Sequence, residues 1–366
     1  MPAEWEPHDA TWLAWPHFRG DWPGKFEPIP WVYAEIIRHL SRHEQVELIV
    51  KNANSEKRAK KTLKLANALN GNIRFHRWLT NRVWTRDSGC TFVTHGVGTD
   101  PSSVEVAEGT GVPSSRPERS STGLQAVKWR FNAWAKYPNY RHDDKIGSLM
   151  AKAARAEEAH AWHRDTRVVL EGGSIDVNGE GILLTTEECL LSKVQQRNRG
   201  FRREDYEQVF ATYLGVRQVI WLGSGIAGDD THGHVDDITR FVSPDTIVTM
   251  IEPNPKDKNY APLQENFQRL KSATDPDGKP FRIVELPMPA PVTFQGRRLP
   301  ASYGNFYIAN GVVLVPVFND PKDRIALNIL SDLFPDREIV PIYSGDLIWG
   351  FGAMHCMTQQ QPAVGR

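Results

Sequence analysis

Cys356 lies near the carboxyl end of the chain, shortly after Gly350 and Gly352 and directly after His355. Glycines at this spacing predict a tight turn, because glycine adopts backbone conformations that other residues avoid. A thiol beside such a turn and a histidine is expected in a partly exposed, electropositive setting, which lowers the pKa of a cysteine. Cys356 is therefore a candidate nucleophile, whereas Cys189, in an apolar run, fits the alternative of a buried cysteine that packs as a small hydrophobe.

Three other segments carry the groups that a nucleophilic thiol needs. Asp87 follows Trp84 by three positions, Glu171 ends an apolar run, and His234 precedes Asp236 by two positions. An imidazole can transfer protons, and carboxylates can hold a cation. Together these residue types predict covalent catalysis by a thiol on a cationic substrate.

Asp87 is followed by Ser88 and Gly89, so the chain is expected to turn directly after the carboxylate and to point it into a cleft. The alternative is an Asx turn, in which the carboxylate satisfies its own backbone, because Asp-Ser-Gly is common turn chemistry. This segment taken alone leaves both interpretations open.

His234 and Asp236 are followed by residues 238–242, a run that predicts an extended strand. Residues two apart on a strand share one face, so the imidazole and the carboxylate are expected to point into the same pocket. The competing hypothesis is a metal site formed by His232, His234 and Asp236, since these ligand types suit zinc or non-haem iron. The two hypotheses differ in whether activity depends on a metal.

Glu171 follows the apolar residues 168–170 and precedes Gly172 and Gly173. A carboxylate at the end of a buried strand needs a partner, and a histidine is a suitable one. A carboxylate bonded to an imidazole fixes its tautomer and favours the protonated form, which can then protonate a leaving group. The alternative is a turn or capping glutamate before two glycines.

The composition is that of an ordinary globular protein rather than a disordered one. The chain has 366 residues, of which 40% are hydrophobic and 24% are charged. Lysine and arginine together number 44, as do aspartate and glutamate, so no excess positive charge attracts nucleic acid or an anionic membrane surface. A site for a small molecule is the expected alternative.

The three cysteines, Cys90, Cys189 and Cys356, are too few and too unevenly spaced for a disulfide framework or a zinc site. The first residues lack a basic segment followed by an apolar run, and no later stretch approaches the ~20 apolar residues of a membrane span. We therefore expect a cytoplasmic protein with reduced thiols.

Short apolar runs alternate with amphipathic patterns along the chain. The expected strands are residues 46–50, 91–94, 181–186, 219–222, 246–251 and 312–317. The expected helices, with apolar residues three and four positions apart, are residues 31–41, 204–214, 261–271 and 324–333. This pattern predicts an α/β fold, and no break in composition divides residues 1–366 into two domains. Residues 96–123, rich in Gly, Pro, Ser and Thr, are expected to form a surface loop, either a lid or a simple insertion.

Taken together, these segments resemble the agmatine deiminase family, the Porphyromonas-type peptidylarginine deiminase group of the guanidino-group modifying superfamily. The matching blocks follow one order along the chain and are residues 2–8, 11–16, 84–89, 131–134, 171–173, 184–190, 229–236, 302–307 and 355–360. So many blocks in one order make the resemblance specific. It implies a pentein fold, which is a pseudo-fivefold α/β propeller of ββαβ units around a central active-site funnel, formed by a single catalytic domain.

The resemblance also implies a role for each candidate residue. Cys356 is expected to be the nucleophile, His234 the general acid and base, and Glu171 the carboxylate that orients His234. Asp87 and Asp236 are expected to grip the guanidinium group. The implied reaction uses no metal, nucleotide or other cofactor.

Agmatine is the substrate that the resemblance favours, because small-molecule members of the family act on it and Trp84 could line its aliphatic chain. The implied reaction hydrolyses the guanidinium group to N-carbamoylputrescine and ammonia through a covalent thiouronium intermediate on Cys356. Other outcomes are arginine in a peptide as the substrate, transfer of the amidino group to an amine, and a guanidinium-binding module without catalysis. Family members often form homo-oligomers, so a second copy of the chain is an expected partner beside the guanidino compound.

The chain departs from the family pattern at two positions. Cys90 stands where a proline is common after the aspartate turn, and Ala353 stands where an asparagine is common before the Ile-His-Cys equivalent. Both positions are expected to border the pocket, so they bear on the identity of the substrate more than on the class of reaction.

Overall fold

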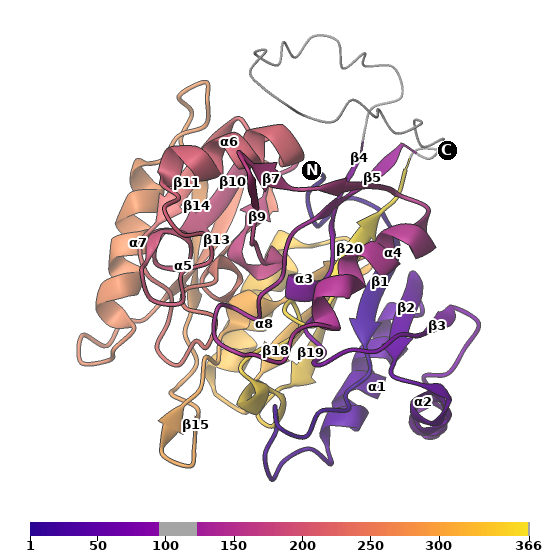
Figure 1. The fold of residues 1–366 in the computed structure, drawn as a ribbon. Coiled ribbons are helices and arrows are strands. Elements are labelled where there is room, and N and C mark those ends of the chain that lie inside the picture. The colour runs from indigo at the N-terminus through magenta and orange to yellow at the C-terminus, as the bar shows by residue number, and fades with distance from the viewer. Residues whose placement is uncertain (95–122, 365–366) are drawn as a thin grey trace.

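The computed structural model describes residues 1–94 and 123–364, which form a mixed α/β fold (Figure 1). The loop expected at residues 96–123 lies outside the described residues, apart from its last residue. The α-helices are α1 (Ile29–Leu40), α2 (Ala53–Leu65), α3 (Thr85–Ser88), α4 (Ile146–Ala154), α5 (Glu187–Leu191), α6 (Arg203–Leu214), α7 (Tyr260–Ser272) and α8 (Lys322–Leu333). Single 3₁₀ turns are η2 (Asp143–Lys145), η3 (Gly172–Ser174), η4 (Val235–Asp237), η5 (Tyr303–Asn305) and η6 (Leu347–Gly350).

The strands are short and spread over the whole chain. They are β1 (His8–Ala14), β2 (Gln45–Val50), β3 (Ile73–Arg77), β4 (Thr91–Thr94), β5 (Leu124–Lys128), β6 (Glu157–His160), β7 (Trp162–His163), β8 (Thr166–Arg167), β9 (Asp176–Val177), β10 (Ile182–Thr186), β11 (Gln218–Leu222), β12 (Thr239–Ser243), β13 (Thr246–Ile251), β14 (Arg282–Pro287), β15 (Thr293–Phe294), β16 (Arg297–Arg298), β17 (Tyr307–Ala309), β18 (Val312–Val317), β19 (Glu338–Tyr343) and β20 (Gln359–Pro362).

Most strands of the described residues fall into five sheets. Four have three strands in chain order, β4-β5-β6, β9-β10-β11, β12-β13-β14 and β17-β18-β19, and the fifth has four strands in the order β20-β1-β2-β3. In each sheet one strand pairs antiparallel with one neighbour and parallel with another. The parallel pair is always joined through at least one α-helix, because a tight hairpin cannot connect parallel strands. In the first sheet β20 pairs with β1, which fixes the segment after Cys356 beside the amino-terminal strand.

The expected strands are all present within one residue of their expected bounds, and the expected helices, α1, α6, α7 and α8, are present within two. Helix α2 was missed because its buried face is thin, consisting of Ser55, Ala59 and Leu63. Its start is instead fixed locally, since the Asn52 side chain accepts a hydrogen bond from the Ser55 backbone N–H at 2.9 Å.

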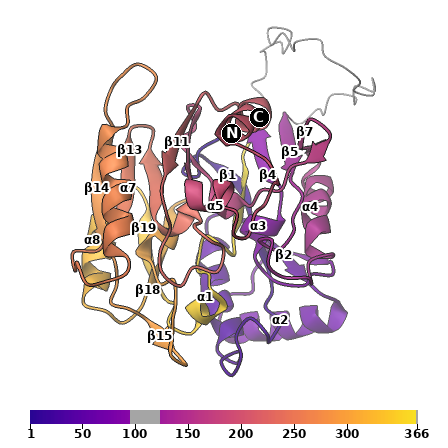
Figure 2. The same ribbon diagram turned by 60° about the vertical axis from the view of Figure 1, so that its left-hand side comes forward.

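The short turns between the sheets meet in the interior. Helix α3 contacts η3, η3 contacts η4, and η4 contacts η5. Figures 1 and 2 show α3 near the middle of the ribbon, with α4 and α7 on opposite sides of it. None of the described helices combines the length and apolar character needed to cross a bilayer.

Candidate active site

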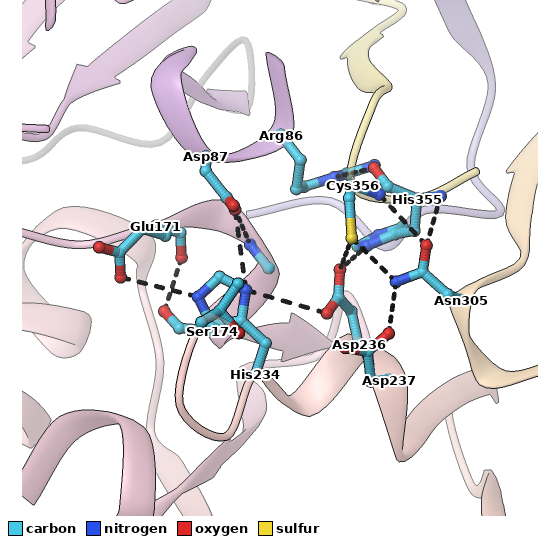
Figure 3. A network of polar contacts seen from close by, with 12 residues as sticks. Arg86, Asp87, Glu171, Ser174, His234, Asp236, Asp237, Asn305, His355 and Cys356 are labelled. Carbon is cyan, nitrogen blue, oxygen red and sulfur yellow. Dashed lines mark hydrogen bonds and ion pairs between the residues drawn. The ribbon is translucent and has the colours of Figure 1, made fainter. Parts of the chain in front are cut away.

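Five candidate residues meet at one place, on turns and a one-turn helix rather than within long elements. Asp87 lies in α3, Glu171 directly precedes η3, His234 precedes η4, Asp236 lies within η4, and Cys356 lies between η6 and β20. All five are buried. Figure 3 shows Asp87, Asp236 and Cys356 on one side of the His234 ring and the Glu171 carboxylate on the other side of that ring.

Asp87 is held by two donors from distant parts of the chain. Its Oδ2 accepts a hydrogen bond from the Trp134 indole at 2.9 Å, and its Oδ1 accepts one from the Gly173 backbone N–H at 3.0 Å. These partners show that the Asx-turn interpretation is wrong. Burial raises the pKa of Asp87, and the opposing charge of His234 does not cancel that shift. The positive charge near Asp87 is therefore too small to offset its burial, and the carboxylate is suited to bind a cation.

His234 lies among three carboxylates. Its Nε2 is 3.8 Å from Glu171 Oε2, while its Nδ1 is 3.9 Å from Asp87 Oδ1 and 4.0 Å from Asp236 Oδ1. Burial lowers the pKa of His234, but Asp87, the neighbouring Cys189 and Glu171 outweigh burial and raise the pKa well above its ordinary value. The imidazole is therefore protonated at neutral pH, which is the form that can donate a proton.

The expected reason for the closeness of His234 and Asp236 is wrong. Strand β12 begins only at Thr239, and η4 lies between the imidazole and that strand. The turn, rather than the two-residue alternation of a strand, directs both side chains into the site.

Glu171 has a stronger partner than the expected histidine. The Arg197 Nε donates to both carboxylate oxygens, at 3.1 and 3.2 Å, and both side chains are fully buried. Burial raises the pKa of Glu171, but Arg197 and then His234 outweigh burial and lower it. Glu171 makes no capping bond to η3, so the capping interpretation is wrong. The Glu171 carboxyl group therefore stays ionised beside His234.

His355 fixes the position of Asp236. Its Nδ1 lies 2.7 Å from Asp236 Oδ2, and its Nε2 lies 2.7 Å from Glu4 Oε2. Glu4 also pairs with Arg86 at 3.2 Å and with Arg240 at 2.9 Å. Burial raises the pKa of Asp236, but the hydrogen bond and charge of His355 outweigh burial and lower it. The amino-terminal segment is therefore part of the framework that keeps this carboxylate ionised and oriented.

The setting of Cys356 differs from the expected one. The residue is only 5% exposed, and its Sγ lies 3.6 Å from Asp236 Oδ2. Burial raises the pKa of the Cys356 thiol well above its ordinary value, and the nearby carboxyls of Asp236, Asp237 and Asp87 raise it further. The expectation of an electropositive, partly exposed thiol with a lowered pKa is wrong. The thiol is therefore protonated at neutral pH in this structure.

Asn305 is a contact of the nucleophile that the residue-by-residue reasoning missed. Its Nδ2 donates to Cys356 Sγ at 3.1 Å and to Asp237 Oδ1 at 3.0 Å, as Figure 3 shows. Its Oδ1 accepts from the backbone N–H of His355 at 3.1 Å. The amide therefore fixes the sulfur and supplies a donor to it. The only signal in the sequence was its place in block 302–307, because an asparagine has no charge to draw attention.

The glycines before Cys356 allow close packing rather than an unusual backbone. Phe351, with φ of 68°, is the left-handed residue of this segment. A Cβ added to Gly352 would lie 2.7 Å from the Trp84 ring and 3.0 Å from Cys356 Cβ. A Cβ added to Gly350 would lie 2.7 Å from the Trp22 ring. The two glycines let the thiol segment pack closely against Trp22 and Trp84.

A cavity of about 280 Å³ reaches Cys356 and Asp87, and Trp84 lines it as expected. His234 and Asp236 are fully buried and do not line this cavity among the described residues. The remaining lining residues are Gly20, Asp21, Pro23, Arg82, Trp134, Tyr137, Asp230, Thr231, Arg297, Trp349, Gly350, Phe351 and Gly352. The candidate nucleophile Cys356 is thus exposed to a cavity whose other walls are largely aromatic and charged.

The two departures from the family pattern do not border this cavity. Cys90 and Ala353 are both buried, and neither is among the described residues that line it. The expectation that they border the pocket is wrong for the cavity at Cys356. Cys90 and Ala353 could therefore affect the choice of substrate only indirectly, through the residues that they pack against.

The structure does not bring the expected metal ligands together. His232 Nδ1 lies 3.7 Å from Glu188 Oε1, and its Nε2 lies 3.1 Å from Ser192 Oγ. Within the described ranges, the groups of close ligand atoms are Glu171 with Cys189 and His234, and Asp236 with Asp237 and Cys356. The hypothesis of a metal site at His232, His234 and Asp236 therefore loses its geometric basis.

Comparisons with known proteins agree with one another. The model of the Porphyromonas-type peptidyl-arginine deiminase family matches residues 1–362. An agmatine deiminase of Medicago truncatula is 34% identical, with 100% of this chain and 96% of the relative covered, and one of Pseudomonas fluorescens is 33% identical with the same coverage. The solved agmatine deiminase of Enterococcus faecalis superposes with a TM-score of 0.85 at 28% identity, covering 100% of this chain and 96% of that one.

Proposed function

The chain belongs to the Porphyromonas-type peptidyl-arginine deiminase family, and from this premise we propose that it is an agmatine deiminase. It would hydrolyse the guanidinium group of agmatine to N-carbamoylputrescine and ammonia. The observation that carries the proposal is that an imidazole lies among three carboxylates, one of which contacts a thiol, and that this thiol and Asp87 line a small cavity.

The proposed grip on the substrate follows from charge and shape. A guanidinium is planar and cationic, and paired carboxylates bind it through parallel hydrogen bonds. Asp236 lies 3.6 Å from the thiol, and Asp87 lines the same cavity as the thiol. Each of these two carboxylates is already oriented by partners within the protein. Holding the guanidinium between them would align its carbon with the sulfur, and Trp84 would line the adjoining chain.

The bound cation would also activate the thiol. Because the pKa of Cys356 is raised by burial and by neighbouring carboxyls, an incoming positive charge favours the thiolate. The thiol proton would leave to solvent, and Asn305 would donate a hydrogen bond to the resulting thiolate. The nucleophile would thus form chiefly when its substrate is present.

The proposed reaction then has two halves. The thiolate forms a C–S bond to the guanidinium carbon, and the protonated His234 gives its proton to one nitrogen, which leaves as ammonia. A thiouronium on Cys356 remains. Neutral His234 takes one proton from water, and the water oxygen bonds to the same carbon. The C–S bond then breaks to release the thiolate, and the second proton of the water leaves to solvent, which gives the neutral urea product. Glu171 would keep His234 oriented through both halves, and the scheme uses no metal or other cofactor.

The size of the cavity favours a small substrate over arginine in a peptide. At about 280 Å³ it is below the ~300–1,000 Å³ typical of sites for drug-sized ligands, and agmatine is smaller than those ligands. The family description nevertheless names peptidyl-arginine, so a peptide belongs in the test.

Three broader expectations extend the proposal. The five sheets, each with an antiparallel pair followed by a parallel pair, are consistent with blades of a pseudo-fivefold pentein propeller formed by residues 1–366 as a single catalytic domain. Three free cysteines fit a reducing compartment, which supports a cytoplasmic location. A homo-oligomer remains an expectation from the family resemblance alone.

The test is ammonia release from agmatine, free arginine and an arginine-containing peptide, with the product identified by mass. We expect release from agmatine in the presence of a chelator, and loss of release in Cys356→Ala. Cys90→Ala is a matched control, because Cys90 is also a free, buried cysteine but does not line the cavity. Turnover that survives Cys356→Ala, or that chelator abolishes, would contradict the proposal.

A further inference from the structure

A second cavity, of about 290 Å³, lies beside the catalytic cavity and has a separate lining. Its walls come from four segments of the chain and consist of His17, Phe18, Lys51, Leu79, Thr80, Asn81, Asn139 and His142. The two linings approach each other where the Arg82 guanidinium of the catalytic cavity lies 5.3 Å from the Phe18 ring. We call this second space the Lys51 cavity. None of the described residues that line it belongs to the proposed catalytic machinery.

The Lys51 cavity holds positive charge without a carboxylate to balance it. No aspartate or glutamate is among the described residues that line it. Within the described part of the chain, the Lys51 ammonium forms neither a hydrogen bond nor an ion pair. Burial and then the charge of Lys51 lower the pKa of His17 to about 4, so the His17 ring is neutral at neutral pH and Lys51 is the fixed positive charge. A concave site with unbalanced positive charge attracts anions.

Two other cavities of the protein balance the charges of their own walls. In the catalytic cavity Asp21 forms a close ion pair with Arg82. In a cavity of about 450 Å³ beside α5, the Arg269 Nη1 lies 3.1 Å from Glu187 Oε1. The Lys51 cavity contains no such pair among its described residues, so an anion from outside the protein would be the first partner of its lysine.

Hydrogen-bond donors without a protein partner line the same cavity. The Asn139 side chain makes no hydrogen bond within the described residues, and neither does the His142 ring. The Asn81 side chain uses only its Oδ1, which accepts from the His142 backbone N–H at 2.8 Å, so its Nδ2 is free to donate. With the Lys51 ammonium, these groups give one ligand donors from three segments of the chain. The oxygens of a phosphate group can accept several such bonds at once.

Bonds behind the wall hold the segments that carry these donors. The His17 Nε2 lies 2.7 Å from the Thr80 hydroxyl oxygen. The buried Asp143 carboxylate accepts from the Asn81 backbone N–H at 2.7 Å, and Asp143 does not itself line the cavity. A ligand would therefore meet a wall that is already ordered, which reduces the entropy lost on binding.

We propose that the Lys51 cavity binds a small organic phosphate. The phosphate group would accept from the Lys51 ammonium and from the side-chain amides of Asn81 and Asn139. The organic group would lie against Phe18 and Leu79, which form the apolar part of the wall. A volume of about 290 Å³ suits a small ligand. The site is separate from the thiol and its carboxylates, so the proposal does not depend on the proposed function.

The test is isothermal titration calorimetry in a buffer of low ionic strength that contains no phosphate. The probes are phenyl phosphate, inorganic phosphate and succinate, which is a dicarboxylate of similar charge. We expect phenyl phosphate to bind with a Kd on the order of 1 mM, and inorganic phosphate about tenfold more weakly because it lacks the group that contacts Phe18 and Leu79. In Lys51→Met the Kd for phenyl phosphate should rise about tenfold, the effect of one lost hydrogen bond to a charged group.

Two further variants separate binding in the cavity from general attraction of anions. Lys57→Met removes an exposed lysine of α2 that does not line the Lys51 cavity, so it changes the net charge equally and should leave the Kd within about twofold. Asn139→Asp places a carboxylate in the wall with little change of shape, so it should abolish binding of phenyl phosphate at about 10 mM. The free energy of unfolding should stay near that of wild type, because the Asn139 side chain has no hydrogen-bond partner within the described residues.

The proposal is overturned if wild type shows neither binding heat nor a rise in its thermal unfolding temperature with about 10 mM phenyl phosphate. It is also overturned by an unchanged Kd in Lys51→Met, by an equal loss of affinity in Lys57→Met, or by tighter binding of succinate than of phenyl phosphate. Lys51→Met keeps the proposal testable if Asn139→Asp does not fold. The titration involves no turnover, so its failure would leave the proposed function standing, and absence of ammonia release from agmatine would leave this site standing.

Discussion

Substitution of Arg197 tests how far the stability of the protein depends on pairing the buried Glu171 carboxylate, which lies beside His234. In Arg197→Met, Glu171 loses the guanidinium that contacts both of its oxygens, while remaining fully buried. Two unit charges 3.1 Å apart attract with on the order of 5 kcal/mol at an effective dielectric constant of about 20. Loss of one partner of a buried pair typically costs about 3–5 kcal/mol, so we expect the free energy of unfolding to fall by that amount.

The assay is urea unfolding followed by tryptophan fluorescence, after reversibility has been established. In the double variant Arg197→Met, Glu171→Gln, the unpaired charge is gone, and about 2 kcal/mol of the loss should return. Arg19→Met is the control, because Arg19 and Glu27 form an ion pair with side chains 70% and 68% exposed, and its loss should cost at most about 1 kcal/mol. A loss below about 1 kcal/mol in Arg197→Met, or purely additive effects in the double variant, would refute the reasoning.

Three further predictions concern the same site. A Cβ in Gly173→Ala would lie 2.5 Å from His234 Nδ1 and 3.0 Å from Asp236 Oδ2, so kcat should fall by about a hundredfold, and near-normal kcat in steady-state assays would contradict this packing. Glu4→Gln removes the carboxylate charge that contacts His355 Nε2, so the protein should lose about 2–3 kcal/mol in urea unfolding and kcat should fall more than KM rises. Because the pKa of His234 is raised in the folded state, its contribution to stability is complete below about pH 6.5 and is lost as the pH rises toward the folded-state pKa. The difference in unfolding free energy between wild type and His234→Asn should therefore shrink between about pH 6.5 and 9, and growth of that difference would show the opposite sign.

The elements that the sequence predicted well are those with a strong local pattern. The run Val312–Val317 is β-branched and bounded by turns, and it forms β18 with those bounds. Residues 261–271 have an amphipathic period and form most of α7. The pairing of β1 with β20 has no local signal, because it joins the two ends of the chain, and it decides where Cys356 lies.

The reactive groups of the site could be predicted from the sequence, but most of the residues that hold them in place could not. Cys356 and His234 were found from residue type and from the resemblance. Arg197, Asn305 and Glu4 act through contacts with residues far away in sequence, so spacing alone gave no reason to select them.

The direction of the Cys356 pKa was predicted wrongly for a related reason. The sequence places one histidine beside the thiol, which suggests a positive setting. The fold turns the His355 ring toward carboxylates and places Asp236 and Asp237 near the sulfur instead. Neighbours in space, rather than neighbours in sequence, set the charge that a titrating group feels.

The central claim is that a covalent bond forms between Cys356 and the substrate carbon. The most direct test is to mix the protein with agmatine, quench with acid within the first turnovers, and measure the mass of the peptide that contains Cys356. The mechanism predicts an adduct equal to agmatine less ammonia on that peptide, absent from Cys356→Ala and from the peptides of Cys90 and Cys189. Release of ammonia from agmatine with no adduct on Cys356 at any quench time, together with turnover by Cys356→Ala, would contradict it.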